Sequence, residues 1–427
     1  MKDILKLKDT IEILKKEYSF DGLYHFTNFS NIKSILTTGY LYSRYDCGEN
    51  GCIFKDAASK DVIYKTELEI KKCVRFYYKD QSYTLYVNEG IKKEKFITDS
   101  HCPIPVYFVF DEKIILDENS YFADGNSKSR FSSIKNTSDF FQSMDWKSIF
   151  SVGILCGSDI EKLETKRKRQ AELLSTVPIS LKNLKFIYFR GIADKRRAIN
   201  LFGNKEWFLV NATKFSLKNF RQCKEEYENN FITDYTYKII NSKNTRQALE
   251  LKVHFNKDSL EGYKLSYDVT DKNGNWKPSS NIKINQSTLL NGTYDTQKID
   301  LTFLDYNDDW DTIKIYLNGI LSIELNISRE KIDMKRTLIR DLKVNRIVKD
   351  AEDKLIIKVQ YNNTKFTDFD QYIEICDSNM KVINKYEILV SKEDLKLNKI
   401  ISINTFNKTA RFIKYLIDGL ECDVIEI

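Results

Sequence analysis

The chain contains 427 residues, of which 42% are hydrophobic and 13% aromatic, with only 4 Pro and 15 Gly. This composition excludes a disordered, collagen-like or proline-rich chain, and the length predicts about two to four domains at roughly 100–200 residues each. The net charge is +7, but residues 1–222 carry +9 and residues 223–427 carry −2. We therefore expect the N-terminal half to meet a polyanion.

No apolar run reaches the ~18 residues of a membrane-spanning helix, and charged residues interrupt positions 2–8, unlike a secretory signal. The chain has three His and eight Cys without a C-x-x-C pair. This spacing argues against a zinc site and against a disulfide framework. We therefore expect no metal and a cytoplasmic protein with reduced cysteines, which are Cys47, Cys52, Cys73, Cys102, Cys156, Cys223, Cys376 and Cys422.

The start of the chain predicts a helix, a strand and a second helix. Ile and Leu recur at three- and four-residue spacing over residues 4–14, which is typical of an amphipathic helix. Residues 22–27 are aromatic and strand-like. A helix is expected over residues 32–36, with Ser30 as its N-terminal cap and Gly39 as its left-handed end.

Further elements alternate between strands and helices. The aromatic residues of 74–87 predict one or two strands, and 103–110 predict a strand whose prolines confine it to a start or an edge. Residues 160–169 predict a basic helix, 171–179 turn strand-like, and 185–190 are expected to be the last strand of this half. Short strands interleaved with few helices predict an α+β domain.

The second half repeats itself. Each copy ends on an Asn-Gly or Asp-Gly pair, which supplies the two positive-φ positions of a tight hairpin. The matching segments are 251–256 with 357–362, 267–271 with 373–377 at the same offset of 106, and 315–321 with 415–421.

We interpret these repeats as two tandem β-sandwiches of immunoglobulin-like type. The predicted organisation is an α+β domain over residues 1–222, a linker over 223–245, a first sandwich over 246–328, and a connector with the second sandwich over 329–427.

Two residues are candidates for chemistry. His25 lies near the end of a strand beside Thr27, where ligands are often bound, although a lone His beside aromatics is more often a core side chain. Glu172 follows a basic run and precedes apolar residues; such a Glu is usually a solvated charge, but in a half-apolar setting it can stabilise a developing cation. The run 166–169 is either a solvated helix face or a phosphate-contacting patch. Motifs for nucleotide hydrolysis, dinucleotide redox chemistry and α/β-hydrolase chemistry are missing.

Five ordered segments together resemble the DarT family of nucleic-acid ADP-ribosyltransferases. Their order over about residues 20–190 is more specific than any one of them, and the β-repeats lie outside the resemblance. The segments are Leu23–Gly39, Val74–Tyr78 with Leu85–Ile91, His101–Phe108, Phe122–Asn126 and Arg167–Leu174.

The resemblance implies an ADP-ribosyltransferase-like mixed fold that transfers ADP-ribose from NAD, as co-substrate, onto a nucleobase. By position, His25, Phe26 and Thr27 would hold the nicotinamide and its ribose. Ser34 and Tyr42 would line the NAD site.

Catalysis and nucleic-acid binding are assigned by the same resemblance. Glu172 would orient the ribose hydroxyls and stabilise the positive sugar as nicotinamide departs. Residues 127–171 would form the loop that presents the nucleic acid. The resemblance, together with the Lys and Arg residues of this loop, predicts contacts to phosphate groups from Arg130, Lys166, Arg167 and Arg169.

The sequence departs from the family at two places. Family members carry an essential Arg before the Phe-Tyr segment, whereas residues 45–74 contain none; Arg75 is the nearest substitute and is taken as the second catalytic residue, with Lys60 and Lys65 as further candidates. The family's Pro-Arg-Ser/Thr-Pro run is altered over residues 79–83, which bears on base preference.

The sequence thus predicts a toxin or anti-phage effector that ADP-ribosylates single-stranded DNA. The same chemistry on RNA, and an inactive nucleic-acid- or partner-binding protein, are the alternatives. A macrodomain antitoxin is the partner implied by resemblance, and the β-repeats are expected either to bind a phage or host protein or to act as a structural arm. No membrane association is expected, and deletion of residues 246–427 should spare oligonucleotide modification.

Overall fold

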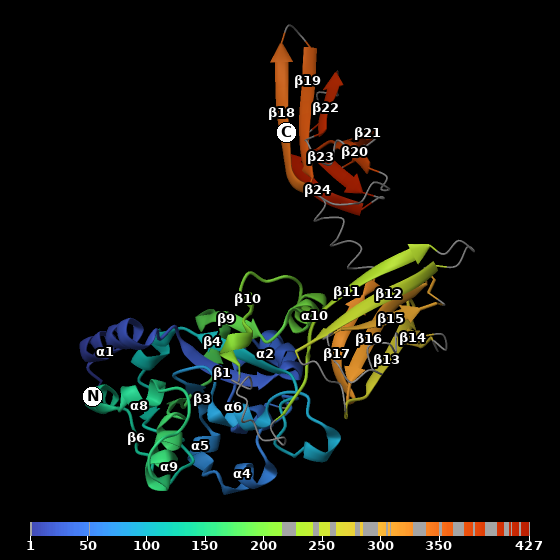
Figure 1. Ribbon diagram of the computed structural model, residues 1–427. Coiled ribbons are helices and arrows are strands. Elements are labelled where there is room, and N and C mark those ends of the chain that lie inside the picture. Colours follow the sequence, from blue (N-terminus) through green and yellow to red (C-terminus); the bar gives the residue numbers. More distant parts are fainter. Residues whose placement is uncertain are drawn as a thin grey trace. The chain divides into compact units, whose positions relative to one another are not determined.

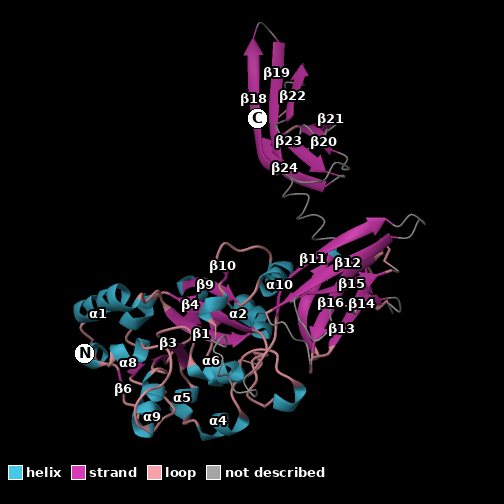
Figure 2. Ribbon diagram, in the orientation of Figure 1, coloured by secondary structure: helices cyan, strands magenta, loops and turns pink. Residues whose placement is uncertain are grey.

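The computed structural model contains one large mixed sheet and several smaller sheets (Figure 1). It describes residues 2–50, 52–215, 228–241, 247–256, 262–277, 282–284, 298–304, 306–307, 309–327, 339–349, 352–361, 371–378, 381–388, 399–404, 410, 412–417 and 420–426. Helices α1 to α10 all precede β11 along the chain, and Figure 2 marks the helices in cyan and the strands in magenta.

The N-terminal part is built on an eight-stranded sheet with the order β10-β9-β4-β1-β3-β7-β5-β6. A separate two-stranded ladder joins β2 (Tyr40–Leu41) to β8 (Ile179–Ser180). The strands of the large sheet are β1 (Leu23–Asn28), β3 (Val74–Tyr77), β4 (Pro105–Phe110), β5 (Ser120–Ala123), β6 (Ile134–Lys135), β7 (Glu172–Ser175), β9 (Leu184–Phe189) and β10 (Phe208–Val210).

Ten α-helices connect these strands. They are α1 (Ile4–Tyr18), α2 (Ile32–Thr38), α3 (Arg44–Glu49), α4 (Lys60–Lys65), α5 (Leu68–Lys71), α6 (Tyr83–Asn88), α7 (Ser138–Ser143), α8 (Trp146–Phe150), α9 (Asp159–Lys168) and α10 (Ile192–Phe202) among the described residues.

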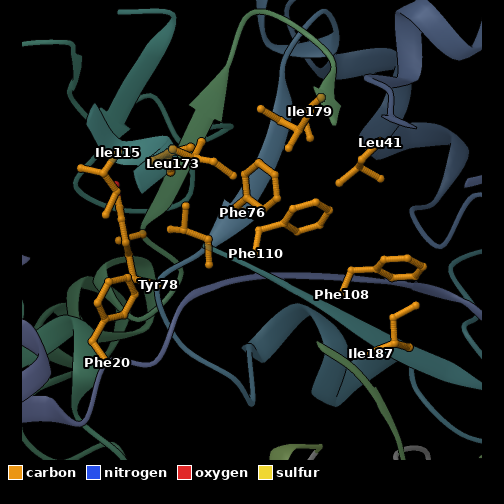
Figure 3. Packing of buried hydrophobic residues seen from close by; sticks show 14 of the residues in the cluster. Phe20, Leu41, Phe76, Tyr78, Phe108, Phe110, Ile115, Leu173, Ile179 and Ile187 are labelled. Atoms are coloured by element: carbon orange, nitrogen blue, oxygen red, sulfur yellow. The ribbon is translucent and has the colours of Figure 1, made fainter. Parts of the chain in front are cut away.

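The core of this part lies on the central strands. All six residues of β4 are buried, which explains why its sequence is continuously apolar rather than alternating. Figure 3 shows Phe76, Phe108 and Phe110 packed together with Leu173, and the rings of Phe76 and Phe110 meet edge to face at 5.3 Å. This rigid core fixes the positions of β1, β3 and β7, the strands that carry the candidate site.

Several predicted elements are confirmed. The first helix, the strand over 22–27, the basic helix and the strand over 185–190 correspond to α1, β1, α9 and β9. Gly39 has φ 73° and ends α2, as expected for a left-handed cap.

Three local predictions are wrong. Residues 83–88 form helix α6, because the Ser82 hydroxyl caps the Leu85 amide and turns the aromatic run into a helix. Ser30 does not cap α2; it lies in a 3₁₀ turn, where its amide donates to the side chain of Asn28. The strand over 185–190 is not the last of this half, since β10 pairs with it in parallel.

Two further sheets follow within the same compact unit, residues 1–325. Aromatic side chains join the two sheets, since the ring of Phe303 contacts those of Tyr267 and Trp310. One sheet has the order β11-β12-β15-β14 and the other β13-β16-β17, with β11 (Ile232–Asn241), β12 (Gln247–Phe255), β13 (Leu265–Asp271), β14 (Ile282–Ile284), β15 (Lys298–Phe303), β16 (Trp310–Leu317) and β17 (Ile320–Asn326).

The hairpin between β16 and β17 has the predicted turn. Asn318 and Gly319 both have positive φ, 48° and 72°, as a two-residue turn of this kind requires. The corresponding pair Asp418-Gly419 lies outside the described residues.

The second compact unit, residues 326–427, repeats the two-sheet arrangement. Apolar residues from both sheets share one buried cluster, for example Ile357, Ile373 and Ile413. The sheets are β18-β19-β22 and β21-β20-β23-β24, with β18 (Ile339–Lys349), β19 (Glu352–Tyr361), β20 (Gln371–Cys376), β21 (Val382–Ile388), β22 (Lys399–Asn404), β23 (Phe412–Ile417) and β24 (Leu420–Glu426). The repeat predicted from the sequence therefore recurs as a β-rich arrangement, with one difference: β14 joins β15, whereas β21 joins β20.

Within the first unit, the α/β part and the first β-rich part are joined by specific contacts. Ile91 and Asn230 exchange two backbone hydrogen bonds of 3.2 and 2.9 Å. Arg197 donates to the backbone oxygen of Leu321 at 2.7 Å and lies 3.7 Å from a carboxylate oxygen of Glu324. None of the described helices has the length and apolar character needed to cross a bilayer.

Candidate active site

A cavity of about 320 Å³ lies beside strands β1, β3 and β7. Its wall combines residues from these strands with residues of α2 and of the segment that follows it. The structure brings together all seven residues predicted for catalysis and cofactor binding, since the lining includes His25, Phe26, Thr27, Ser34, Tyr42, Arg75 and Glu172.

Glu172 is the first residue of β7 and is only 1% exposed. One of its carboxylate oxygens accepts a hydrogen bond of 2.9 Å from the backbone N–H of Ser127, and the other lies 3.9 Å from the Arg75 guanidinium. The carboxylate is therefore held by a backbone amide on the turn after β5 and faced by a cation on β3.

Arg75 lies on β3, next to β7 in the sheet. Burial is the largest single influence and lowers the pKa of Arg75, but Glu172 together with the neighbouring Tyr77, Asp56 and Cys73 raises it above its usual value. Arg75 therefore stays charged and supplies a cation beside Glu172 in the cavity wall.

His25 is fixed in one tautomer by the backbone. Its Nδ1 lies 3.0 Å from the carbonyl oxygen of Arg75. Because a carbonyl only accepts, Nδ1 must carry the proton when the ring is neutral, which leaves Nε2 as an acceptor. Burial lowers the pKa of His25 to about 4. At neutral pH the ring is therefore uncharged and can accept a hydrogen bond, but it cannot act as a proton donor through Nε2.

An aromatic wall stands beside these polar groups. The rings of Phe26 and Tyr77 are stacked, with centroids 5.9 Å apart and planes 10° apart. Burial raises the pKa of Tyr77, so its hydroxyl stays protonated at neutral pH. Flat apolar rings next to a carboxylate suit a ligand that combines an aromatic ring with a polar sugar.

A further part of the lining comes from a segment that we call the cover, residues 44–50 and 52–56. Arg44 donates to Asp56 through two nitrogens, one of them at 2.9 Å, and so closes the two ends of the cover. The side chain of Asn31 bonds both the amide and the carbonyl of Lys55, at 2.7 and 2.9 Å. These contacts attach the cover to α2 and the adjoining turn.

Sequence reasoning missed the cover. Arg44 lies one position before the arginine-free stretch 45–74, and it lines the cavity. Lys60 and Lys65, considered as substitutes, do not line it. A usable signal was present, because Ser43 caps α3 and places Arg44 at the first position of that helix.

The four basic residues predicted to bind nucleic acid fall into two pairs. Arg130 is exposed and lies over the ring of Phe131, and Lys166 lies 3.9 Å from the ring centre of Tyr83. Arg167 is only 10% exposed; it pairs with Asp124 and Glu164.

Arg169 donates to the backbone oxygens of Val152 and Gly153. Arg167 and Arg169 therefore hold the segment between β5 and β7 in shape. Arg130 and Lys166 are the members of the set that lie on aromatic rings.

The comparison with known families decides what this cavity belongs to. Residues 24–216 match the family model described as DarT, ssDNA thymidine ADP-ribosyltransferase. These residues are therefore similar to the DarT family. All seven predicted site residues and Arg44 lie within the matched region, and the two β-rich parts lie after it.

Solved structures similar to this chain include DarT of Thermus sp. 2.9 in complex with ADP-ribosylated ssDNA, at 14% identity and TM-score 0.39, covering 46% of this chain and 97% of that chain. The same DarT in complex with NAD+ matches at 14% identity and TM-score 0.36, covering 45% and 96%. Thermosipho africanus DarTG in complex with ADP-ribose matches at 17% identity and TM-score 0.35, covering 46% and 51%. No curated protein matches the chain.

Proposed function

We propose that this protein is an NAD-dependent ADP-ribosyltransferase that modifies a base of single-stranded DNA, with thymidine, which the family description names, as the first base to test. One observation carries the proposal: Glu172 and His25 come from different strands and line a single cavity inside the region that matches the DarT family.

The residues of the cavity fit NAD as a substrate. NAD carries two phosphates, and cationic side chains line the cavity on several sides. The volume of about 320 Å³ lies within the usual range for small-molecule sites. The cations are Arg44, Lys55, Lys71, Arg75 and Lys128.

Glu172 supplies the charge that the reaction needs. The bond between the nicotinamide nitrogen and the ribose carbon breaks, nicotinamide leaves with the bonding electrons, and positive charge develops on the sugar. A nitrogen of the base then bonds to that carbon and its proton is released. A buried carboxylate held by Ser127 and facing Arg75 stabilises the positive charge as it moves from the nicotinamide ring onto the sugar.

His25 positions the substrate in this proposal. Its Nε2 is an acceptor at neutral pH, so it suits a donor such as a ribose hydroxyl or a carboxamide N–H. The stacked rings of Phe26 and Tyr77 supply the apolar surface for nicotinamide.

For nucleic acid we propose Lys128, Arg130 and Lys166 as phosphate contacts. Lys128 and Arg130 are exposed on the turn that follows β5, and Lys128 also lines the cavity. These residues place positive charge beside the cavity, where the backbone of a bound strand would run. Arg167 and Arg169 serve by shaping this segment.

We propose further that the β-rich parts are immunoglobulin-like sandwiches that bind a partner protein. The repeated two-sheet arrangement and the apolar core that the sheets share support this assignment. A macrodomain antitoxin as the restraining partner, and a cytoplasmic place of action, complete the proposal by resemblance to the DarT family.

The test uses the full chain, NAD and three oligonucleotides: single-stranded DNA with thymidine, the same DNA with every thymidine replaced, and RNA of the same base order. We expect a mass increase of one ADP-ribose on the first alone. Glu172→Gln should abolish it, whereas Glu17→Gln, an exposed carboxylate on α1, should not.

Near-normal transfer by Glu172→Gln would remove Glu172 from the mechanism. Equal modification of RNA would favour the RNA alternative. Absence of any NAD consumption with each oligonucleotide would favour an inactive binding protein.

A further inference from the structure

Two cysteines lie together in the cover. Cys47 belongs to α3 and Cys52 follows it, both are free thiols, and both line the cavity. The amide of Cys52 donates to the carbonyl of Cys47 at 2.8 Å, and burial, followed by the nearby Cys52 thiol, raises the pKa of the Cys47 thiol. The two cysteines are therefore neighbours in the reduced protein.

The pair lies between the contacts that hold the cover in place. The ion pair between Arg44 and Asp56 joins the chain before Cys47 to the chain after Cys52. Asn31 binds Lys55 in addition. A covalent bond between the two sulfurs would thus form inside a segment whose ends are already fixed. The backbone bond between Cys52 and Cys47 keeps the two residues adjacent, as the geometry of a disulfide requires.

We propose that Cys47 and Cys52 are a redox-active pair whose disulfide tightens the cover over the cavity, with a low-molecular-weight disulfide such as oxidised glutathione as the oxidant. The effect on NAD rests on the proposed function; formation of the disulfide does not. In a reducing compartment such a bond is transient and regulatory rather than structural.

The reaction is a two-step exchange. Burial raises the pKa of the Cys47 thiol to about 12, so Cys47 is protonated at neutral pH and Cys52 makes the first attack. The Cys52 thiolate bonds to one sulfur of the oxidant and releases the other as a thiol. The Cys47 sulfur then loses its proton and displaces the remaining oxidant sulfur. Two electrons and two protons pass to the oxidant, which becomes two thiols.

Neighbouring cysteines provide internal controls. Cys73 also lines the cavity, but its thiol bonds the carbonyl of Glu69 at 3.2 Å. Cys156 is exposed, and Cys102 is buried. Cys156 should therefore form at most a mixed disulfide with glutathione, whereas the pair should give an internal disulfide.

To test the proposal, the full chain is equilibrated with mixtures of reduced and oxidised glutathione. The remaining thiols are then alkylated, and the peptides are analysed by mass spectrometry. We expect loss of alkylation at Cys47 and Cys52 together, and a linked peptide lighter by two hydrogen atoms. Cys73→Ser should retain the bond, and Cys47→Ser should leave only a mixed disulfide at Cys52. Dissociation of NAD from the oxidised protein should be slower, on the order of threefold, because fewer conformations of the cover remain.

The results separate the two proposals. Independent alkylation of the two cysteines at every glutathione ratio overturns the redox pair and leaves the transferase assignment standing. A disulfide without NAD binding in either state overturns the transferase assignment alone. A disulfide with equal NAD dissociation in both states overturns the proposed control of the cavity.

Discussion

Two parts of the cavity lining are built differently. The floor consists of residues on β1, β3 and β7, three strands of one buried sheet, and its central carboxylate, Glu172, is 1% exposed. The cover is a short helix and a loop attached by the Arg44–Asp56 pair and by Asn31. Backbone ladders hold the floor, whereas side chains hold the cover.

This difference indicates a division of labour. Groups held by a packed sheet are pre-organised and suit the chemical step. A segment held by a few side-chain contacts opens at a lower free-energy cost and suits binding and release of the substrate. Changes in the floor should therefore lower turnover, and changes in the cover should alter the Michaelis constant for NAD.

The largest effect is expected at Arg75. Arg75→Gln removes the cation beside Glu172 and should lower kcat for oligonucleotide modification by about 100-fold with little change in KM for NAD. Initial rates over a range of NAD concentrations measure both constants. A change confined to KM would place Arg75 with the cover instead of the floor.

His25 should make stability depend on pH. Its pKa is about 4 in the folded chain and 6.5 in the unfolded chain, so the unfolded state takes up a proton first as the pH falls. The stability that depends on the neutral ring is complete above pH 6.5 and is lost towards pH 4. Between pH 7 and pH 5 the unfolding free energy should fall by roughly 2 kcal/mol more in the parent chain than in His25→Gln.

Urea unfolding of both proteins at the two pH values measures this difference. Asp194, whose pKa burial raises to about 6, titrates in the same range in both proteins and cancels in the comparison. Equal pH dependence in the two proteins would mean that the ring is not held in its neutral form.

Arg44 tests the cover. Arg44→Gln removes the ion pair with Asp56 and one cation of the cavity, and should raise KM for NAD by about tenfold while leaving kcat within about twofold. The same kinetic measurement applies. A matching loss of kcat would show that the cover takes part in the chemical step.

The smallest effect is expected at Asn31. Asn31→Ala removes two bonds to Lys55 and should raise KM for NAD about threefold. It should also speed proteolytic cleavage within the cover, while Ser30→Ala, an exposed neighbour, should do neither. Unchanged cleavage would assign the attachment of the cover to Arg44 alone.

The sequence predicted the floor better than the cover, for a physical reason. Strand β4 and helix α1 follow strong apolar patterns, and the residues of the floor belong to motifs that come in a recognisable order. Arg44 and Asp56 are twelve positions apart in a stretch without apolar periodicity, so their pairing depends on tertiary folding. Helix α6 was missed for a related reason, since one serine hydroxyl outweighs the strand preference of the aromatic residues that follow.

The contacts between Ile91 and Asn230 and between Arg197 and Glu324 bear on how this protein should be shortened for biochemical work. A stop codon after residue 245 would remove both acceptors of Arg197 and open the surface on which they pack to solvent. Ending the polypeptide at Leu325 retains those acceptors. That longer fragment is the minimal catalytic piece to express, and it already carries the first of the two β-rich parts.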